Sequence, residues 1–484
     1  MRQSRMVESK VVDRRERVII GLMFLFFLIV NVTTADRSPT VWGDEVMFAD
    51  PAINLVRGHG FTSTAWPWQP SDAPFAGNSP LYPLLLTAWL ALTGISATAV
   101  RSLNYFLMIA AAVMFWKLLR RHSHAGMLWR LLAITVLLAG NGITFSYRTG
   151  RYDVLGIVLV LAGTLLWESD TISARIGLLV ISGLLPWAGL QLIPMTCVGI
   201  AALLVFERPA PFKRAATAIA GMALGSAILV GYFISRATLG LFIASVTDLG
   251  GIATPLSAKV RGLPLVFISD PSGTILLLTA ILLLVTGTVS DKQERRLTTA
   301  GIGLAICLPV FLYFAAKYTV AYTWAATLVL TFVIACSANS VNSRRMRRVA
   351  AAGMVAAGIV GLPLRLAVTC AQWNARDYKP VEQFVVRNIE PDDRVLTDFQ
   401  AYYPAKLRVG ELHLPVQIRA MTAAEKARTN VIIAVGDNGR RLAALIGGQF
   451  EQTAAYEAPK SSFSDQKWLA SPYHLVILRR KSTP

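Results

Sequence analysis

Runs of apolar residues, each close to the length needed to cross a membrane, recur along most of this chain and constrain its fold more than any other feature. About 20 helical residues span the hydrocarbon core of a bilayer. The chain has 484 residues, of which 54% are hydrophobic and 15% are charged, whereas about a quarter of the residues in soluble domains are charged. The runs lack the alternation of barrel strands. The sequence therefore predicts an α-helical polytopic membrane protein.

We interpret the apolar runs as about 11 transmembrane helices. The first run is long and no clear small-x-small cleavage site follows it, so we interpret it as a retained helix rather than a cleaved signal peptide. Pro186 and Pro194 bracket a turn within 175–206, and the basic cluster that follows, which must be cytoplasmic, favours two short spans over one kinked span. The predicted spans are 18–34, 102–119, 127–146, 153–167, 175–189, 190–206, 214–235, 273–290, 297–316, 319–337 and 349–371.

The basic residues orient these spans. The net charge is +19, and the Lys and Arg residues form short clusters between apolar runs, as cytoplasmic loops do under the positive-inside rule. The clusters are Arg14, Arg15 and Arg17; Arg120 and Arg121; Lys213 and Arg214; Arg295 and Arg296; and Arg344, Arg345, Arg347 and Arg348. The pattern predicts a cytoplasmic N-terminus and membrane lipids, not nucleic acid, as partners. It places the loops 35–100, 147–152 and 237–272 outside.

The chain divides into a transmembrane domain, 1–371, and an extracytoplasmic α/β domain, 372–484. Within the first outer loop, Val46–Val56, ended by Gly58, and Leu81–Leu92 are predicted interfacial helices. The tail is charged and alternates short β-branched runs with helical stretches. Strands are predicted at 393–398, 430–436 and 474–480, and helices at 380–388 and 440–446.

Ionisable residues gather in the outer loops, where such groups usually have a function or a partner. The candidates are Asp44, Glu45, His59, Arg148, Arg151, Asp153, Arg261, Lys317 and Tyr318. Asp44 is also a possible helix N-cap, the cations also suit snorkelling to lipid headgroups, and His59 also suits a turn. A carboxylate can act as general base, and Arg and Lys can hold a phosphate. Together they suggest glycosyl transfer from a polyprenyl phosphate sugar, although a transporter can assemble the same charges.

Four segments resemble the GT-C superfamily of integral-membrane glycosyltransferases. They are the loop with GDE, then INLVRGHGFTS, then NSPLYPLLLTAWLALTGISATAVRSLN, and then RTGRYDVLGIVLVLAGTLLW. The sequence is similar to bacterial protein-mannosyltransferase-like enzymes, the lipid A aminoarabinose transferase and the rhizobial galacturonosyltransferases. The resemblance covers residues 40–170 and continues as topology to about residue 371. It implies many helices, with two interfacial helices roofing an outer cavity.

The resemblance also implies roles for particular residues. Asp44 matches the catalytic base or substrate anchor, and Glu45 would be secondary. Arg148, Arg151 and Asp153 match the polar cluster that opens the fourth span, while Lys317 and Tyr318 match donor-phosphate contacts. The chain departs from many relatives between spans five and six, where Trp187 and Gln191 stand in place of a lysine. Donor binding would then depend on Arg148, Arg151, Arg261 or Lys317, and Trp187 is either a sugar-stacking or a packing residue.

We therefore predict an inverting glycosyltransferase of the bacterial cytoplasmic (inner) membrane, acting on the outer face. Its donor is a polyprenyl phosphate sugar, and its acceptor is a lipid, a polysaccharide or a protein. No nucleotide is expected, and a divalent metal is possible because an acid pair beside a phosphate can hold one. The alternatives are a transporter or flippase of lipid-linked sugars, and a non-catalytic scaffold or sensor.

Overall fold

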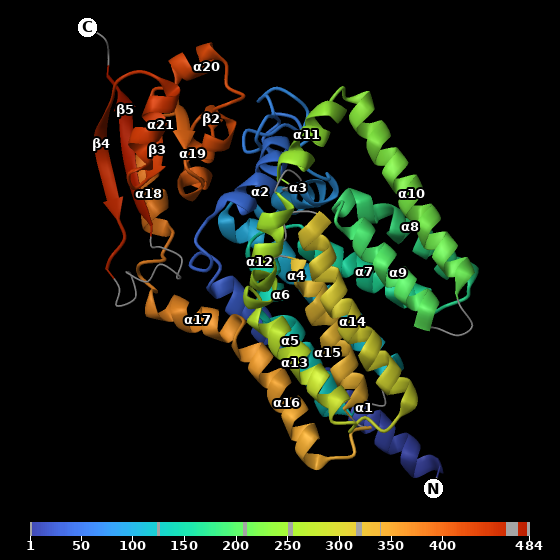
Figure 1. Ribbon diagram of the computed structural model, residues 1–484. Helices are drawn as coiled ribbons and strands as arrows, with labels where there is room; N and C mark the ends of the chain where they lie inside the picture. Colours follow the sequence, from blue (N-terminus) through green and yellow to red (C-terminus); the bar gives the residue numbers. More distant parts are fainter. Residues whose placement is uncertain are drawn as a thin grey trace.

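A bundle of long helices carries a smaller α/β unit at one end (Figure 1). The computed structural model describes residues 2–122, 126–206, 211–249, 255–315, 322–338, 340–460 and 473–481. The helices before the tail are α1 (Arg2–Thr33), α2 (Gly43–Val56), α3 (Leu81–Thr93), α4 (Ala97–His122), α5 (Met127–Ala139), α6 (Asn141–Arg148), α7 (Asp153–Trp167), α8 (Ile172–Ala188), α9 (Leu192–Phe206), α10 (Phe212–Ser235), α11 (Leu239–Leu249), α12 (Leu256–Ile268), α13 (Pro271–Val285), α14 (Lys292–Ala315), α15 (Trp324–Ser337), α16 (Arg344–Ile359) and α17 (Leu362–Ala371).

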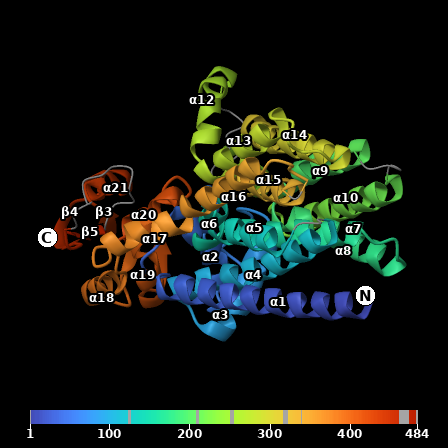
Figure 2. The same ribbon diagram turned by 90° about the horizontal axis from the view of Figure 1, so that it is seen from below.

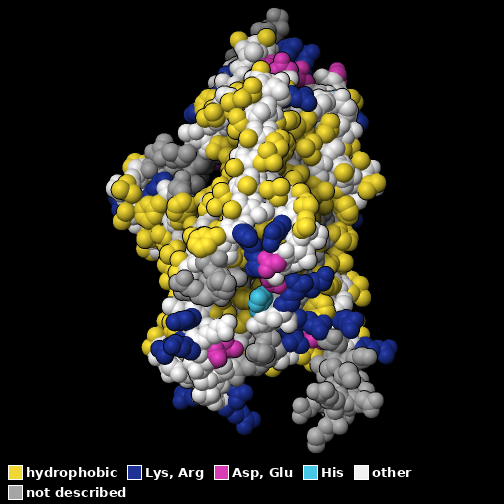
Figure 3. All heavy atoms as spheres, turned by 90° about the vertical axis from the view of Figure 1, so that its right-hand side faces the viewer, with side chains coloured by type: hydrophobic (Ala, Val, Ile, Leu, Met, Phe, Trp, Pro, Cys, Tyr) yellow, Lys and Arg dark blue, Asp and Glu magenta, His cyan; other side chains and the backbone are white. Residues whose placement is uncertain are grey.

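Among the described residues, each of the 11 predicted spans overlaps one helix or two successive helices, and the chain is a multi-pass membrane protein. Among the described residues, five helices are long and apolar enough to cross a membrane, or seven if two bent pairs each form one span. Six further apolar helices are shorter. The count of 11 crossings stays a prediction. On the face in Figure 3, apolar side chains dominate the middle and basic side chains gather on the lower part, a distribution that suits a membrane protein.

Two bends distinguish the bundle from the predicted set of straight spans. The axes of α5 and α6 differ by 50°, and those of α12 and α13 by 81°. The α5–α6 bend is at Gly140, whose neighbour Asn141 bonds across to α13 through its backbone N–H and Ser272 Oγ at 2.7 Å. The outer loop 237–272 also holds two helices, α11 and α12, which the sequence analysis did not predict.

The first outer loop forms the two helices that its sequence predicts. α2 ends before Gly58, which has a φ of +79°, a left-handed conformation that glycine adopts without strain. The N-cap residue of α2 is Trp42, and no side chain caps that terminus. Asp44 is therefore not the N-cap, and its carboxylate is left for another role.

The tail forms a five-stranded sheet of order β2-β1-β3-β5-β4. The strands are β1 (Arg394–Thr397), β2 (Glu411–His413), β3 (Val431–Val435), β4 (Phe450–Glu457) and β5 (His474–Arg480), and the helices are α18 (Lys379–Asn388), α19 (Tyr402–Arg408), α20 (Ala423–Arg428) and α21 (Asn438–Ile446). Strands β2, β1 and β3 are parallel, and β5 is antiparallel to β3 and β4. The three predicted strands and two predicted helices are confirmed; β2, β4, α19 and α20 were missed. The α/β unit lies beside α2 (Figure 1).

Candidate active site

The first turn of α2 sends its two acids in different directions. Successive helical residues point about 100° apart, so Asp44 and Glu45 cannot face the same side. The Asp44 side chain keeps 39% of its surface exposed, whereas that of Glu45 is fully buried. The exposed carboxylate is available for chemistry, and the buried one is held by other side chains.

Arg151 lies between two carboxylates. Its Nη1 donates to Asp44, and its Nε donates to Asp153 Oδ2 at 2.8 Å. Burial lowers the pKa of Arg151, but the charges of Asp153 and Asp44 raise it by more. The pKa therefore lies well above its ordinary value. The guanidinium therefore stays charged, neutralises one carboxylate and fixes the orientation of Asp44.

Glycine and aromatic rings position Arg151. Gly150 has a φ of +61°, and a Cβ there would lie 3.0 Å from Glu45 Cγ, so the turn before Arg151 requires glycine. The rings of Phe48, Tyr152 and Tyr322 lie 5.6–5.9 Å from the guanidinium carbon, within the range of a cation–π interaction. This cage excludes water from the inner side of the Asp44–Arg151 pair.

Glu45 is held from two sides. Arg101 of α4 donates from Nε at 3.1 Å and from Nη2 at 2.6 Å, and Tyr403 of α19 donates its hydroxyl at 3.0 Å. Burial raises the pKa of Glu45, and Arg101 and Tyr403 act in the opposite direction. A two-point ion pair of this kind sets geometry as well as charge. Glu45 therefore positions α2 and does not face the solvent that Asp44 faces.

Arg148, predicted as a phosphate ligand, is committed to the protein. Its guanidinium donates to Asn31 Oδ1 at 2.6 Å, to Thr34 Oγ1 at 2.8 Å and to Ser38 O at 2.7 Å. All of these acceptors belong to α1 or to the segment that follows it. In the structure Arg148 therefore ties α6 to α1, and its role in phosphate binding stays a prediction.

The remaining predicted residues are dispersed. His59 is exposed beyond the far end of α2, where partial burial and the charges of Arg57 and Lys406 lower its pKa. Trp187 packs on Tyr232 and donates to Gly225 O at 3.0 Å, and Arg261 is exposed on α12. The side chain of Gln191 lies beside Gly189, as does the ring of Tyr152. Lys317 and Tyr318 lie outside the described residues.

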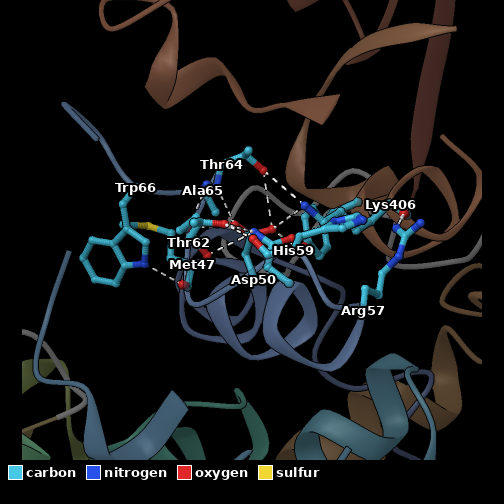
Figure 4. A network of polar contacts seen from close by, with 12 residues as sticks. Met47, Asp50, Arg57, His59, Thr62, Thr64, Ala65, Trp66 and Lys406 are labelled. Atoms are coloured by element: carbon cyan, nitrogen blue, oxygen red, sulfur yellow. Dashed lines mark hydrogen bonds and ion pairs between the residues drawn. The ribbon is translucent and has the colours of Figure 1, made fainter. Parts of the chain in front are cut away.

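A second buried network joins α2 to the tail (Figure 4). Asp50 is fully buried and accepts from Ser63 Oγ and Thr64 N, both at 2.6 Å, and from the Tyr402 hydroxyl. Lys406 Nζ lies 3.0 Å from its Oδ1. Burial raises the pKa of Asp50, but Lys406 and these donors lower it more, and the net shift is downward. The sequence analysis missed this network because its parts lie more than 340 residues apart.

Arg101 is another residue that the sequence analysis missed. The signal was present, since an arginine within the apolar helix α4 is costly without a partner.

Among the described residues, no group of three His, Cys, Asp or Glu side chains lies close enough to hold a metal ion.

An apolar groove lies between the helices below this site. Its volume is about 170 Å³, and its walls come from α7, α8, α9, α10, α14 and α15. The lining includes Trp167, Leu178, Gly199, Leu203, Leu308 and Trp324. Trp324 stands two residues after Tyr322, whose hydroxyl is 3.3 Å from that of Tyr152. Two of the helices that line the groove, α7 and α15, thus begin within two residues of the cage residues Tyr152 and Tyr322.

The fold of the chain is similar to the folds of three solved membrane glycosyltransferases. It is similar to ArnT from Cupriavidus metallidurans, solved bound to undecaprenyl phosphate, with a TM-score of 0.58 and 12% identity over 96% of this chain and 99% of that chain. The Archaeoglobus fulgidus oligosaccharyltransferase gives a TM-score of 0.54 and 10% identity over 96% and 75% of the two chains. AftD from Mycobacteria, an arabinofuranosyltransferase, gives 0.51 and 12% over 96% and 40%. No family model and no curated protein matches.

Proposed function

We propose that this protein is a glycosyltransferase that takes its sugar from a polyprenyl-phosphate-linked donor, with Asp44 as the general base. The observation that carries the proposal is the partly exposed Asp44 carboxylate, which Arg151 holds through Oδ2. Among the described residues no donor to Asp44 Oδ1 is found. That oxygen can accept a proton from a substrate hydroxyl.

The proposed reaction is a single displacement. The acceptor hydroxyl attacks the anomeric carbon while Asp44 takes its proton, the bond from that carbon to the phosphate oxygen breaks, and the polyprenyl phosphate leaves. The anomeric centre is inverted because attack and departure occur on opposite faces. The ArnT structure, bound to undecaprenyl phosphate, supports a lipid-linked donor for this fold. The outer face of a bacterial cytoplasmic membrane, with an outer tail, is the proposed location.

The groove suits the lipid part of such a donor. Its walls are mostly aliphatic and aromatic, and two of the helices that form them, α7 and α15, begin within two residues of Tyr152 and Tyr322. A polyprenyl chain buried there gains the favourable free energy of removing apolar surface from water or headgroups. The acceptor is a lipid, a polysaccharide or a protein.

Mass spectrometry of glycolipids, surface polysaccharide and glycoproteins tests the function. The strains are a deletion in the source organism complemented with the wild type, with Asp44→Asn, or with Asp392→Asn, an exposed tail residue, as a matched control. We expect one sugar increment to be absent in the Asp44→Asn strain, with the protein present in the membrane, and intact in the control. A wild-type pattern with Asp44→Asn would refute the role of Asp44.

The same strains separate a transferase from a flippase. If the protein is a transferase, the unused donor accumulates on the outer face of the membrane in the Asp44→Asn strain. A flippase defect would instead leave the lipid-linked sugar on the inner face. Accessibility of that sugar to an added impermeant oxidant distinguishes the two locations.

A filled groove tests the lipid path. Gly199 lines the groove, and a Cβ built there meets nothing within 4 Å. We expect Gly199→Leu to raise the KM for the donor at least tenfold with little effect on folding. Gly303→Leu is the matched control, because Gly303 of α14 also has open space but does not line the groove. Equal donor KM values in the two variants would contradict the assignment of the groove.

A further inference from the structure

Two of the predicted phosphate ligands, Arg148 and Arg151, are already bound to other groups in the protein. Arg151 is paired with two carboxylates, and Arg148 donates to α1 and the segment after it. A phosphate needs donors that the protein has not used, since only those can replace the water around its oxygens. A phosphate site elsewhere on the outer side of the bundle therefore requires a positive charge without an acidic partner.

Arg365 of α17 has this property. Its Nη2 donates to Asn141 Oδ1 at 2.9 Å. Its Nε is buried and has no acceptor among the described residues, where no carboxylate lies within ion-pair distance either. Asp270 attracts it from farther away. An arginine is always charged, and a partly buried charge without a close partner is costly at a membrane boundary.

The side chain of Arg365 points into the bundle and not toward the lipid. Its guanidinium carbon lies 5.8 Å from the centre of the Phe145 ring on α6. Figures 1 and 2 both place α17 beside α6. Asn141 is itself fixed, because its backbone N–H donates to Ser272 Oγ at 2.7 Å and its side chain donates to Ser269 O at 3.2 Å. The position of the guanidinium is therefore built by three elements, α6, α13 and α17.

A second donor without an acceptor in the described part of the chain, the indole N–H of Trp42, belongs to a ring that contacts the same Phe145 side chain. The Trp42 ring packs edge-on against Phe145 at 5.4 Å, and its Nε1 is buried without an acceptor among the described residues. Trp42 precedes Asp44 by two residues and is only partly covered, as is Phe145. An indole N–H and a guanidinium fork, arranged around one aromatic ring beside the proposed base, match the donors that a tetrahedral oxyanion requires.

We propose that Arg365 and Trp42 form a binding site for the phosphate group of a membrane-embedded substrate. The inference rests on the proposed function and deepens it. The phosphate has two possible sources, the polyprenyl phosphate of the donor or a phosphate carried by a lipid acceptor. Arg365 supplies charge and a planar pair of donors, Trp42 supplies one donor, and the proposed base Asp44 follows Trp42 by two residues.

Binding measurements on the purified full-length protein in nanodiscs of neutral lipid test this site. The probes are undecaprenyl phosphate against undecaprenol, and phosphatidic acid against diacylglycerol, with affinities read by native mass spectrometry. We expect Arg365→Gln to weaken binding of one phosphate probe at least tenfold, which is the loss typical of a charge-assisted hydrogen bond, and to leave the neutral lipids unaffected. Trp42→Phe, which keeps the ring, should weaken the same probe about threefold to tenfold.

The two pairs of probes distinguish the sources. A loss confined to undecaprenyl phosphate assigns the site to the donor, and a loss confined to phosphatidic acid assigns it to the acceptor. Arg236→Gln is the matched control, since Arg236 is exposed after α10 and its guanidinium packs on the Tyr232 ring. Equal losses in Arg365→Gln and Arg236→Gln, or no loss in either, would overturn the proposal.

Two further variants keep this test independent of folding and of the transferase activity. If Arg365→Gln does not fold, Arg365→Lys retains the charge but loses the fork, and an affinity equal to that of the wild type in both Arg365→Lys and Trp42→Phe would overturn the site. Asp44→Asn should bind both phosphate probes as the wild type does. Loss of transfer in Asp44→Asn with unchanged binding in Arg365→Gln would refute only this inference. Arg365-dependent binding without any transfer would refute only the proposed function.

Discussion

Removing Lys406 should loosen the contact between the tail and the first outer loop by a predictable amount. Lys406 Nζ lies 3.0 Å from the Asp50 carboxylate, which is fully buried. Loss of one partner of a buried ion pair costs about 3–5 kcal/mol, because the other charge remains unpaired. Asp50 keeps its hydrogen bonds from Ser63, Thr64 and Tyr402 after Lys406→Met. We therefore expect the lower end of that range, about 3 kcal/mol.

Hydrogen exchange of the backbone amides of α2 and α19 measures this loss, because exchange reports the free energy of local opening. A decrease of about 3 kcal/mol corresponds to exchange roughly a hundredfold faster. The Asp50→Asn/Lys406→Met double variant should lose less than the sum of the two single variants, because the groups are in contact. Arg394→Gln is the control: Arg394 pairs with Glu411 at 3.2 Å with 46% of its side chain exposed, and such pairs contribute about 0–1 kcal/mol.

The pH dependence of this contact has a defined sign. The folded-state pKa of Asp50 is lowered from 3.8, chiefly because Lys406 and hydrogen-bond donors outweigh the effect of burial. The stabilisation by the ionised carboxylate is thus complete above the unfolded-state pKa and is lost as the pH falls below 3.8 through the folded-state value. Unchanged exchange of α2 in Lys406→Met at neutral pH, together with additive effects in the double variant, would refute the reasoning.

Three further variants test other contacts. Tyr403→Phe removes the hydroxyl that donates to Glu45 at 3.0 Å. We expect transfer to be about tenfold slower with an unchanged donor KM, since a hydrogen bond to a charged group contributes about 1.5–3 kcal/mol. An unchanged kcat in steady-state assays would contradict a positioning role. Gly225→Ala should lower the thermal midpoint by several degrees, because its Cβ would lie 2.0 Å from Gly183 O; a midpoint equal to that of the wild type would contradict this packing. Trp187→Phe loses only the bond to Gly225 O and should lower stability by about 1 kcal/mol while sugar transfer stays at the wild-type rate, and a large rise in donor KM would instead favour sugar stacking by Trp187.

The sequence by itself determined most of the helices, because a local run of apolar residues predicts each of them. All 11 predicted segments are helical, as are both helices of the first outer loop, and three strands of the tail were located from their β-branched runs. The position of Asp44 at the start of α2 followed from the same local pattern. Helices α11 and α12 were missed because Gly and Pro residues interrupt their apolar runs, and such residues are typical of turns.

Only the tertiary structure decided which charged residues are free. Arg148 and Arg151 are close in sequence and equally basic, yet one ties α6 to α1 and the other holds Asp44. Glu45 meets Tyr403 across 358 residues, and Arg365 is left without an acidic partner at ion-pair distance within the described chain. Local sequence carries propensity and hydropathy, but burial and charge pairing arise from groups that approach one another only after the chain has folded.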